Sequence, residues 1–154
     1  MGAIEETGIS DFLHATGRAT GYKEDVMRDQ GMFEQAYRHL MTQGRRSCVP
    51  HPRGLLIPAY YGDHGRTCPV GLFIPPEVYD PAFEGMSLEQ IIPRCSALRE
   101  LNVSLLFALR TCHDTLTPPR WKKRLQILAD EYKLTVTPEL EALRLNEGPQ
   151  EYYP

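Results

Sequence analysis

The chain has 154 residues, of which 42% are hydrophobic and 24% charged, a composition typical of a globular protein with a core and one that excludes wholesale disorder. Its formal net charge is −3, and because proteins that bind nucleic acid usually carry a basic balance or a basic stripe, we expect no nucleic-acid partner. No apolar run is long enough to span a bilayer, and the segment Met1 to Glu6 lacks the apolar core of a signal peptide, so we expect a cytoplasmic protein without a membrane partner.

The cysteine and histidine spacings argue against a metal or redox centre. The four cysteines form no C-x-x-C pair and no zinc-binding spacing, and free thiols buried as small apolar side chains are the simplest interpretation. Four of the histidines are widely spread, whereas a metal site needs clustered ligands. We therefore expect neither a metal nor a cofactor. The residues concerned are Cys48, Cys68, Cys95, Cys112, His39, His51, His64 and His113.

The first 30 residues carry the weakest signals and are predicted to form an N-terminal extension that is partly helical or loose. Ser10 and Asp11 are suited to cap a short helix that Gly17 would end. The dipeptides Thr16-Gly17 and Thr20-Gly21 are typical of loops.

An amphipathic helix is predicted from Met32 to Gln43, because its apolar residues recur at steps of three and four and share one face. Gly44 is a suitable stop, and Arg45-Arg46 would then lie near the negative end of the helix dipole. The segment Ser47 to Arg53 contains two prolines and is predicted to be a loop. The apolar residues of the helix are Phe33, Ala36, Tyr37, Leu40 and Met41.

Two apolar and aromatic runs, Leu55 to Tyr61 and Thr67 to Ile74, flank the turn-forming segment Gly62 to Arg66 and predict a β-hairpin. Pro58 and Pro69 cannot donate ladder hydrogen bonds, so each is expected at an edge or a strand end. A lone hairpin is marginal in water and must pack on helices. The predicted class is therefore α+β, with a central hairpin of two or three antiparallel strands packed against several short helices.

The second half of the chain supplies those helices. Ser87 to Gln90 has capping-box spacing, and Asn102 is placed to cap a later helix. Thr117-Pro118 and Thr137-Pro138 each combine an N-cap residue with proline at the first helical position. The apolar residues expected to face the core are Leu98, Leu101, Leu105, Leu109, Cys112, Trp121, Leu125, Leu128, Tyr132, Leu140 and Leu143.

These elements divide the chain into three parts. The N-terminal extension covers residues 1–30, a single α+β domain covers residues 31–145, and a flexible tail covers residues 146–154.

Three short motifs occur in the middle of the chain. They are His39-Leu40-Met41-Thr42-Gln43-Gly44, then Cys68-Pro69-Val70-Gly71-Leu72-Phe73-Ile74-Pro75, then Tyr79-Asp80-Pro81-Ala82-Phe83-Glu84-Gly85. Together with Tyr60, Gly65, His113-Asp114 and Trp121, they resemble the HLxxQG, CxVGxxIP and YDPxxEG signature of a family of uncharacterised small proteins of bacteriophages and bacteria.

The resemblance covers roughly residues 32–134 and implies a phage or prophage setting, in which small accessory proteins often bind and inhibit a component of host defence. Members of that family often have a cysteine two residues before the strand tyrosine, where this chain has Pro58. That departure weakens a paired-cysteine metal or redox role for the hairpin.

The candidate ligand-binding residues are basic, aromatic and acidic side chains near the hairpin. Arginine forks suit phosphates, tyrosine rings offer flat faces, and carboxylates accept hydrogen bonds from ribose hydroxyls or amines. Convergence of these groups would suit a nucleotide-like anion, although no G-x-x-x-x-G-K-[ST] phosphate loop is present to support turnover. The structural alternative is solvated charge at a helix end and an ordered loop. The set is Arg45, Arg46, Tyr60, Arg66, Tyr79, Asp80, Glu84 and His113.

We expect a non-enzymatic binding protein, a phage-type accessory factor that docks on a host protein or sequesters a nucleotide-like ligand. The competing class is a small hydrolase or transferase that uses Cys68 or His113, with His64 and Asp114 as further candidates for the base and its orienting acid. The structural alternatives are a buried inert thiol and a histidine at a helix end. A third alternative is an assembly role, which predicts a closed homo-oligomer.

Overall fold

The computed structural model describes residues 17–148, with side chains from residue 21 onward. Within this range the chain is mostly helical with one two-stranded antiparallel sheet, which confirms the predicted α+β class. In chain order, the helices and strands are α2 (Gly17–Gln43), β2 (Cys48–Pro50), β3 (Leu56–Pro58), α3 (Leu88–Ile91), α4 (Ser96–Arg99), α5 (Val103–Thr115), α6 (Trp121–Tyr132) and α7 (Pro138–Ala142). Short 3-10 helices occupy Asp63–Gly65, Gly71–Phe73, Pro81–Gly85, Ile92–Arg94 and Pro118–Arg120.

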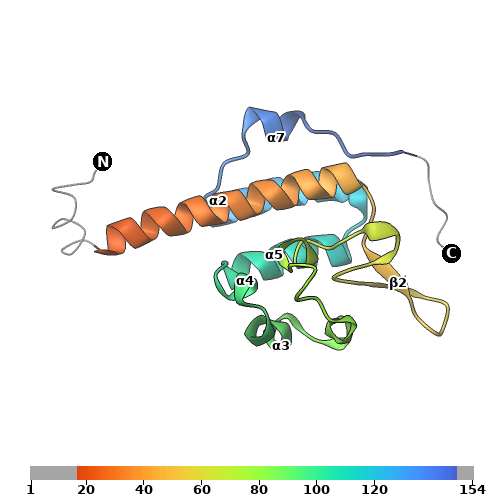
Figure 1. The fold of residues 1–154 in the computed structure, drawn as a ribbon. Helices are drawn as coiled ribbons and strands as arrows, with labels where there is room; N and C mark the ends of the chain where they lie inside the picture. The colour runs from red at the N-terminus through yellow and green to blue at the C-terminus, as the bar shows by residue number, and fades with distance from the viewer. Residues whose placement is uncertain (1–16, 149–154) are drawn as a thin grey trace.

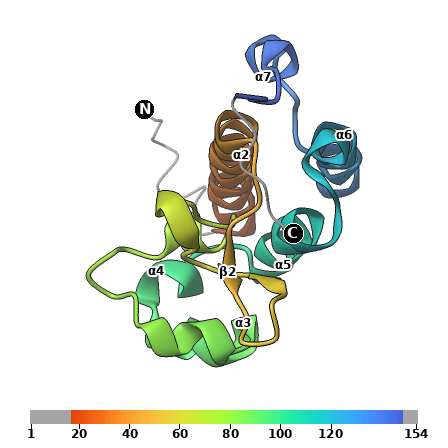
Figure 2. The same cartoon turned by 90° about the vertical axis from the view of Figure 1, so that its right-hand side faces the viewer.

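The long helix α2 is the element against which the others are arranged (Figure 1). Helices α5, α6 and α7 all contact it, and the view along its axis shows them following one another around one side (Figure 2). The β2–β3 hairpin lies beside the C-terminal end of α2. The last turn of α5 reaches the chain at the entrance to this hairpin, and this junction contains the candidate site.

Helix α2 is much longer than the sequence predicts. It begins at Gly17, so the predicted loops at residues 16–17 and 20–21 are wrong for the described residues, and the boundary drawn at residue 31 falls inside the helix. Gly21 and Gly31 each cost about 1 kcal/mol in a helix interior relative to alanine. The packing of Met32 to Met41 in the core offsets that cost, because tertiary contacts supply most helix stability in proteins. The predicted cap at Ser10 and Asp11 lies outside the described residues.

The hairpin exists, but its strands lie one segment earlier than predicted. Strand β2 pairs antiparallel with β3, with Val49 opposite Ile57, so a strand forms where the sequence suggests a loop. The predicted pairing across the 62–66 turn shrinks to a single bridge between Tyr61 and Thr67. Pro69 has no N–H to donate, and Gly71–Phe73 is a 3-10 helix, so the second predicted strand cannot continue the ladder.

Three of the four predicted helix starts follow the expected capping chemistry, whereas Thr117 precedes the 3-10 helix Pro118–Arg120 and its side chain makes no capping hydrogen bond. Ser87 and Gln90 form a reciprocal capping box at α3, and the Asn102 side chain accepts the N–H of Leu105 at the start of α5. Thr137 caps α7 by accepting the N–H of Leu140. Each such cap contributes roughly 1 kcal/mol.

One apolar core joins α2 to the later helices and to the chain around the hairpin. Phe33, Tyr37 and Trp121 are fully buried, and each large apolar side chain contributes roughly 1.5–3 kcal/mol on burial. Within residues 17–148, no helix combines the length and apolarity needed to cross a membrane. Other predicted core residues that are buried are Leu98, Leu105, Leu109, Cys112, Leu125, Leu128 and Leu140.

The chain after α7 returns to the C-terminal end of α2. The N–H of Asn146 donates to the carbonyl of Met41 at 2.8 Å, and its side-chain amide donates to the carbonyl of Thr42 at 2.9 Å. Both carbonyls belong to the last turn of α2, where no helical partner is available. Residues 146–148, predicted as the start of a flexible tail, therefore cap α2, and residues 149–154 lie outside the described range.

Candidate functional site

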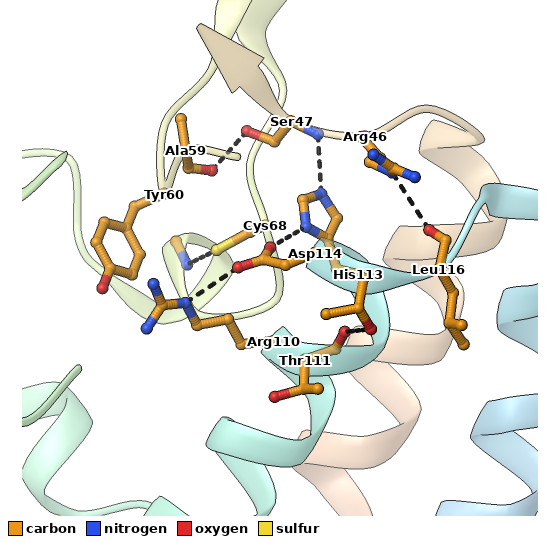
Figure 3. A network of polar contacts seen from close by, with 12 residues as sticks. Arg46, Ser47, Ala59, Tyr60, Cys68, Arg110, Thr111, His113, Asp114 and Leu116 are labelled. Atoms are coloured by element: carbon orange, nitrogen blue, oxygen red, sulfur yellow. Dashed lines mark hydrogen bonds and ion pairs between the residues drawn. The ribbon is translucent and has the colours of Figure 1, made fainter. Parts of the chain in front are cut away.

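His113 is the centre of a polar network where α5 meets the hairpin (Figure 3). It lies in the last turn of α5, is 0% exposed, and stacks on Trp121 with ring centroids 5.6 Å apart. Its Nε2 accepts the N–H of Ser47 at 2.8 Å, so the proton of this ring lies on Nδ1, which donates to Asp114 Oδ1 at 2.6 Å. Both ring nitrogens are therefore engaged within the protein, and His113 links α5 to the hairpin.

Ser47 extends this network into the hairpin. The residue is fully buried, and its hydroxyl lies 2.8 Å from the carbonyl oxygen of Ala59 and 3.2 Å from that of Arg66. The N–H of Ala59 in turn donates to the carbonyl of Ser47 at 2.9 Å. One residue thus joins two points of the chain after β3 to the end of α5.

Arg110 and Asp114 form the side of the network that faces Tyr60. Arg110 Nε lies 3.3 Å from Asp114 Oδ2, one helical turn away, and its guanidinium carbon lies 5.1 Å from the centre of the Tyr60 ring. Tyr60 is buried, which raises its pKa to about 12, and its hydroxyl donates to the carbonyl of Met86 at 2.9 Å. The face and the hydroxyl of Tyr60 are both occupied by contacts within the chain.

Glu84 holds the chain after β3 in place. Its two carboxylate oxygens accept the backbone N–H groups of Tyr60 and Tyr61 at 2.9 and 3.0 Å, and the hydroxyl of Tyr79 at 2.5 Å. Burial and this contact with Glu84 raise the pKa of Tyr79. The rings of Tyr61 and Tyr79 stack with centroids 4.0 Å apart. Asp80 acts locally, since its carboxylate accepts the N–H of Ala82 at 2.8 Å.

The predicted arginines Arg45 and Arg46 contact other parts of the chain than Tyr60 and Glu84. Arg46 donates to the carbonyl of Leu116 at 3.2 Å and lies on the opposite side of His113 from Tyr60 (Figure 3). Arg45 donates to the carbonyl of Gly148 at 2.8 Å, and it lines a hollow of about 150 Å³ together with Arg66. The structure therefore brings Tyr60, Glu84 and Tyr79 together but does not bring Arg45 and Arg46 to them.

The cysteine proposed as a nucleophile is shielded. Cys68 is buried, its sulfur accepts the N–H of Gly71 at 3.4 Å, and burial raises its pKa to about 12. A nucleophilic cysteine needs a thiolate, which burial in apolar surroundings disfavours. The geometry therefore supports the structural interpretation of Cys68, and the occupied Nε2 of His113 supports the same interpretation there.

The hollow between these groups is too small for an organic ligand. It is lined by Tyr60, Cys68, Glu84, Arg110 and Asp114, and its volume is about 20 Å³. That is enough for about one water molecule. Ligand pockets measure roughly 300–1,000 Å³.

Arg110 and Ser47 belong to the network but were not among the residues predicted from the sequence. Arg110 and Asp114 are separated by four residues, which is a recognisable helical ion-pair spacing, so that signal was available. Ser47 contributes its backbone N–H and hydroxyl from a segment predicted to be a loop, and no sequence pattern marks such a role.

A larger hollow lies on the outer face of α5. Its volume is about 530 Å³, and we call it the Phe107 groove. Phe107 is 53% exposed and Val103 is 40% exposed, one helical turn apart. The lining residues are Leu88, Glu89, Val103, Ser104, Phe107, Ala108 and Tyr132.

Comparison with known proteins adds no relative. No family model, curated protein sequence or solved structure matches the chain. Among the described residues, no group of three or more histidine, cysteine and acidic side chains is placed to hold a metal ion. The resemblance to the phage family stays a prediction.

Proposed function

We propose that the protein is a non-enzymatic binding protein that docks on another protein through the outer face of α5. The observation that carries this proposal is the Phe107 groove, where Phe107 and Val103 are exposed in a hollow of about 530 Å³. Aromatic side chains are enriched at the centres of protein interfaces, where burial of apolar area stabilises the complex. In the phage setting implied by the resemblance, the partner is a component of host defence.

Docking is favoured over sequestration of a nucleotide-like ligand by where the candidate residues lie. Sequestration needs Arg45 and Arg46 beside Tyr60 and Tyr79, whereas Arg46 contacts Leu116. Tyr60 and Tyr79 hold the chain after the hairpin together through Met86 and Glu84. Docking through the outer face of α5 does not require the residues of this internal network to contact the partner.

The test compares partner retention by matched variants. Affinity-tagged full-length protein is expressed in its host, and retained proteins are quantified by mass spectrometry for wild type, Phe107→Asp and Leu55→Asp. Leu55 is 65% exposed in the hairpin turn and controls for the loss of an exposed apolar side chain. We expect Phe107→Asp to reduce retention of the partner roughly tenfold or more, since a buried charge without a partner is costly, while Leu55→Asp retains it.

Two results would contradict the proposal. One is equal retention by the wild type and Phe107→Asp, with circular dichroism showing that the variant is folded. The other is a small molecule, rather than a protein, detected by native mass spectrometry of the purified wild type. The same spectra report any closed homo-oligomer, which is the outcome expected for an assembly role.

A further inference from the structure

A second groove lies between α5 and α6 and has a volume of about 500 Å³. Thr111 and Thr115 of α5 line one side of it. Arg120, which immediately precedes α6, lines the other side together with Lys123, Arg124 and Ile127 of α6. Three of these residues are cationic, so we call this hollow the basic groove.

The cations of the basic groove are not neutralised by the part of the chain that the structure describes. The side chains of Arg120, Lys123 and Arg124 form no hydrogen bond or ion pair with residues 21–148. No acidic residue lines the groove. By contrast, Lys122 of the same helix donates to the carbonyl of Glu141 at 2.6 Å. The chain has enough acidic residues to pair with its basic ones, 20 against 17. Within residues 21–148 the groove cations are unpaired because the fold places no acidic side chain beside them.

The rest of the lining is apolar or offers no donor. Ile127 is 38% exposed. The hydroxyls of Thr111 and Thr115 donate back to the carbonyls of Phe107 and Thr111, at 2.9 and 2.7 Å, so they offer no free proton to a ligand. A ligand held by phosphates alone would leave Ile127 without a contact. A protein segment with carboxylates beside an apolar side chain can contact both the cations and Ile127.

The basic groove continues the Phe107 groove along α5. Thr111 lies one turn after Phe107, and the hydrogen bond of 2.6 Å between Ser104 and Tyr132 shows that α5 and α6 stay side by side at the other end. Val103 to Thr115 covers about 18 Å at 1.5 Å per residue. An extended segment of about six residues has the same length.

We infer that the basic groove binds an acidic segment of the partner protein, with carboxylates at Arg120, Lys123 and Arg124 and an apolar side chain on Ile127. This inference rests on the proposed docking function and names the chemistry of the partner. The acidic segment runs along α5, so that its neighbouring apolar residues cover Phe107.

The first experiment measures direct binding to defined probes. Fluorescein-labelled peptides with one leucine and an increasing number of glutamates are titrated with the full-length protein, and fluorescence anisotropy gives Kd at about 50 and 200 mM salt. We expect Kd to fall as glutamates are added, and the effect to weaken at the higher salt concentration. A matched peptide with glutamine in place of glutamate is expected to bind roughly tenfold more weakly.

Charge-reversal variants localise the effect. The test variant carries Arg120→Glu, Lys123→Glu and Arg124→Glu. The control carries Arg53→Glu, Lys133→Glu and Arg144→Glu, an equal change of net charge at exposed positions outside the groove. We expect the test variant to lose the preference for glutamate and the control to keep most of it.

The outcomes separate this inference from the proposed function. Equal loss in both variants, or a single-stranded oligonucleotide that binds as tightly as the most acidic peptide, would overturn the acidic-segment inference. Partner retention in the host gives an independent readout. If Phe107→Asp loses the partner while the groove variant keeps it, docking stands and the acidic segment is rejected. If Phe107→Asp keeps the partner, the docking proposal itself fails.

Discussion

His113 shows how the contacts of one side chain can lie far beyond its neighbours in the sequence. Histidine is the most frequent general base, yet here Nε2 accepts a backbone N–H and Nδ1 donates to Asp114. A general base needs a free lone pair within reach of a substrate. The sequence could place His113 at a helix end, but Ser47 is 66 residues away, so only the fold decides what the ring contacts.

Replacement of His113 by alanine is expected to destabilise the fold by about 2–4 kcal/mol. The buried N–H of Ser47 would lose its acceptor, and a cavity would open beside Trp121. Urea denaturation followed by circular dichroism measures the change. His51→Ala is the control, because the His51 side chain accepts one exposed hydrogen bond in the hairpin turn, from the N–H of Arg53 at 3.2 Å. Equal effects of the two variants would contradict the structural role.

His39 makes stability depend on pH. Burial lowers its pKa from the usual 6.5, while a hydrogen bond with the carbonyl of Thr67 acts in the opposite direction. The unfolded chain then binds more protons than the folded one below about pH 6.5, so the unfolding free energy falls as pH falls through that value. Urea denaturation gives the unfolding free energy at each pH between about 7.5 and 5.5. We expect this free energy to change less steeply with pH for His39→Gln than for wild type. Identical slopes would contradict this assignment.

At the scale of elements, Glu84 replaces the missing strand partner of the chain after β3. The sequence predicts that Tyr60 and Tyr61 belong to a strand, but their N–H groups are accepted by a carboxylate instead of by a neighbouring backbone. This explains why a segment with strand composition is stable outside a sheet. It also explains why Glu84 and Tyr79, predicted as pocket residues, point inward.

The Glu84→Gln variant is expected to lose about 2–4 kcal/mol of stability. One carboxylate oxygen is replaced by an amide NH2 group, which donates and cannot accept, and the other oxygen loses its negative charge, so the donors that face Glu84 lose their charged partner. Thermal unfolding measures the loss, and Glu100→Gln, at an exposed position, is expected to change stability little. A variant as stable as wild type would show that the Glu84 contacts are weak.

Local signals predicted the later helices well and α2 and the hairpin less well. Caps such as Ser87 and Thr137 act through atoms a few residues away, so the sequence contains the whole interaction. The start of α2 and the register of the hairpin depend instead on packing against segments that are distant in the sequence. Gly21 is locally unfavourable in a helix and Pro50 in a strand, so the sequence predicts loops at both positions. In the fold, Gly21 lies within α2 and Pro50 lies within β2.

For the molecule as a whole, the return of the C-terminal chain to α2 depends on a close approach at Gly44. This residue has φ of +64°, and a Cβ at this position would overlap the carbonyl oxygen of Asn146. The site therefore requires glycine twice, once for its backbone conformation and once for the space that Asn146 fills.

Gly44→Ala is expected to cost more than Gly54→Ala, which serves as the matched control. Gly54 has φ of +83° but nothing within 4 Å of an added Cβ, so its replacement carries only the conformational cost of about 1–2 kcal/mol. Gly44→Ala adds displacement of residues 146–148 from α2. Denaturation midpoints give the difference, and hydrogen exchange at the amide of Asn146 reports the displacement directly. Equal costs would show that the contact with Asn146 is unimportant.

The sequence by itself determined the α+β class, the helix caps at Ser87, Asn102 and Thr137, the Gly44 stop and most of the core, because these depend on periodicity and on contacts a few residues apart. Only the tertiary structure decided that Glu84 accepts the N–H groups of Tyr60 and Tyr61 and that His113 accepts the N–H of Ser47. It also showed that Arg120, Lys123 and Arg124, which lie within five residues of one another in the sequence, line one groove opposite Thr111 and Thr115 of α5. The physical reason is that hydrogen-bond partners and groove walls are set by segments far apart in the chain, and no local pattern encodes which segments meet.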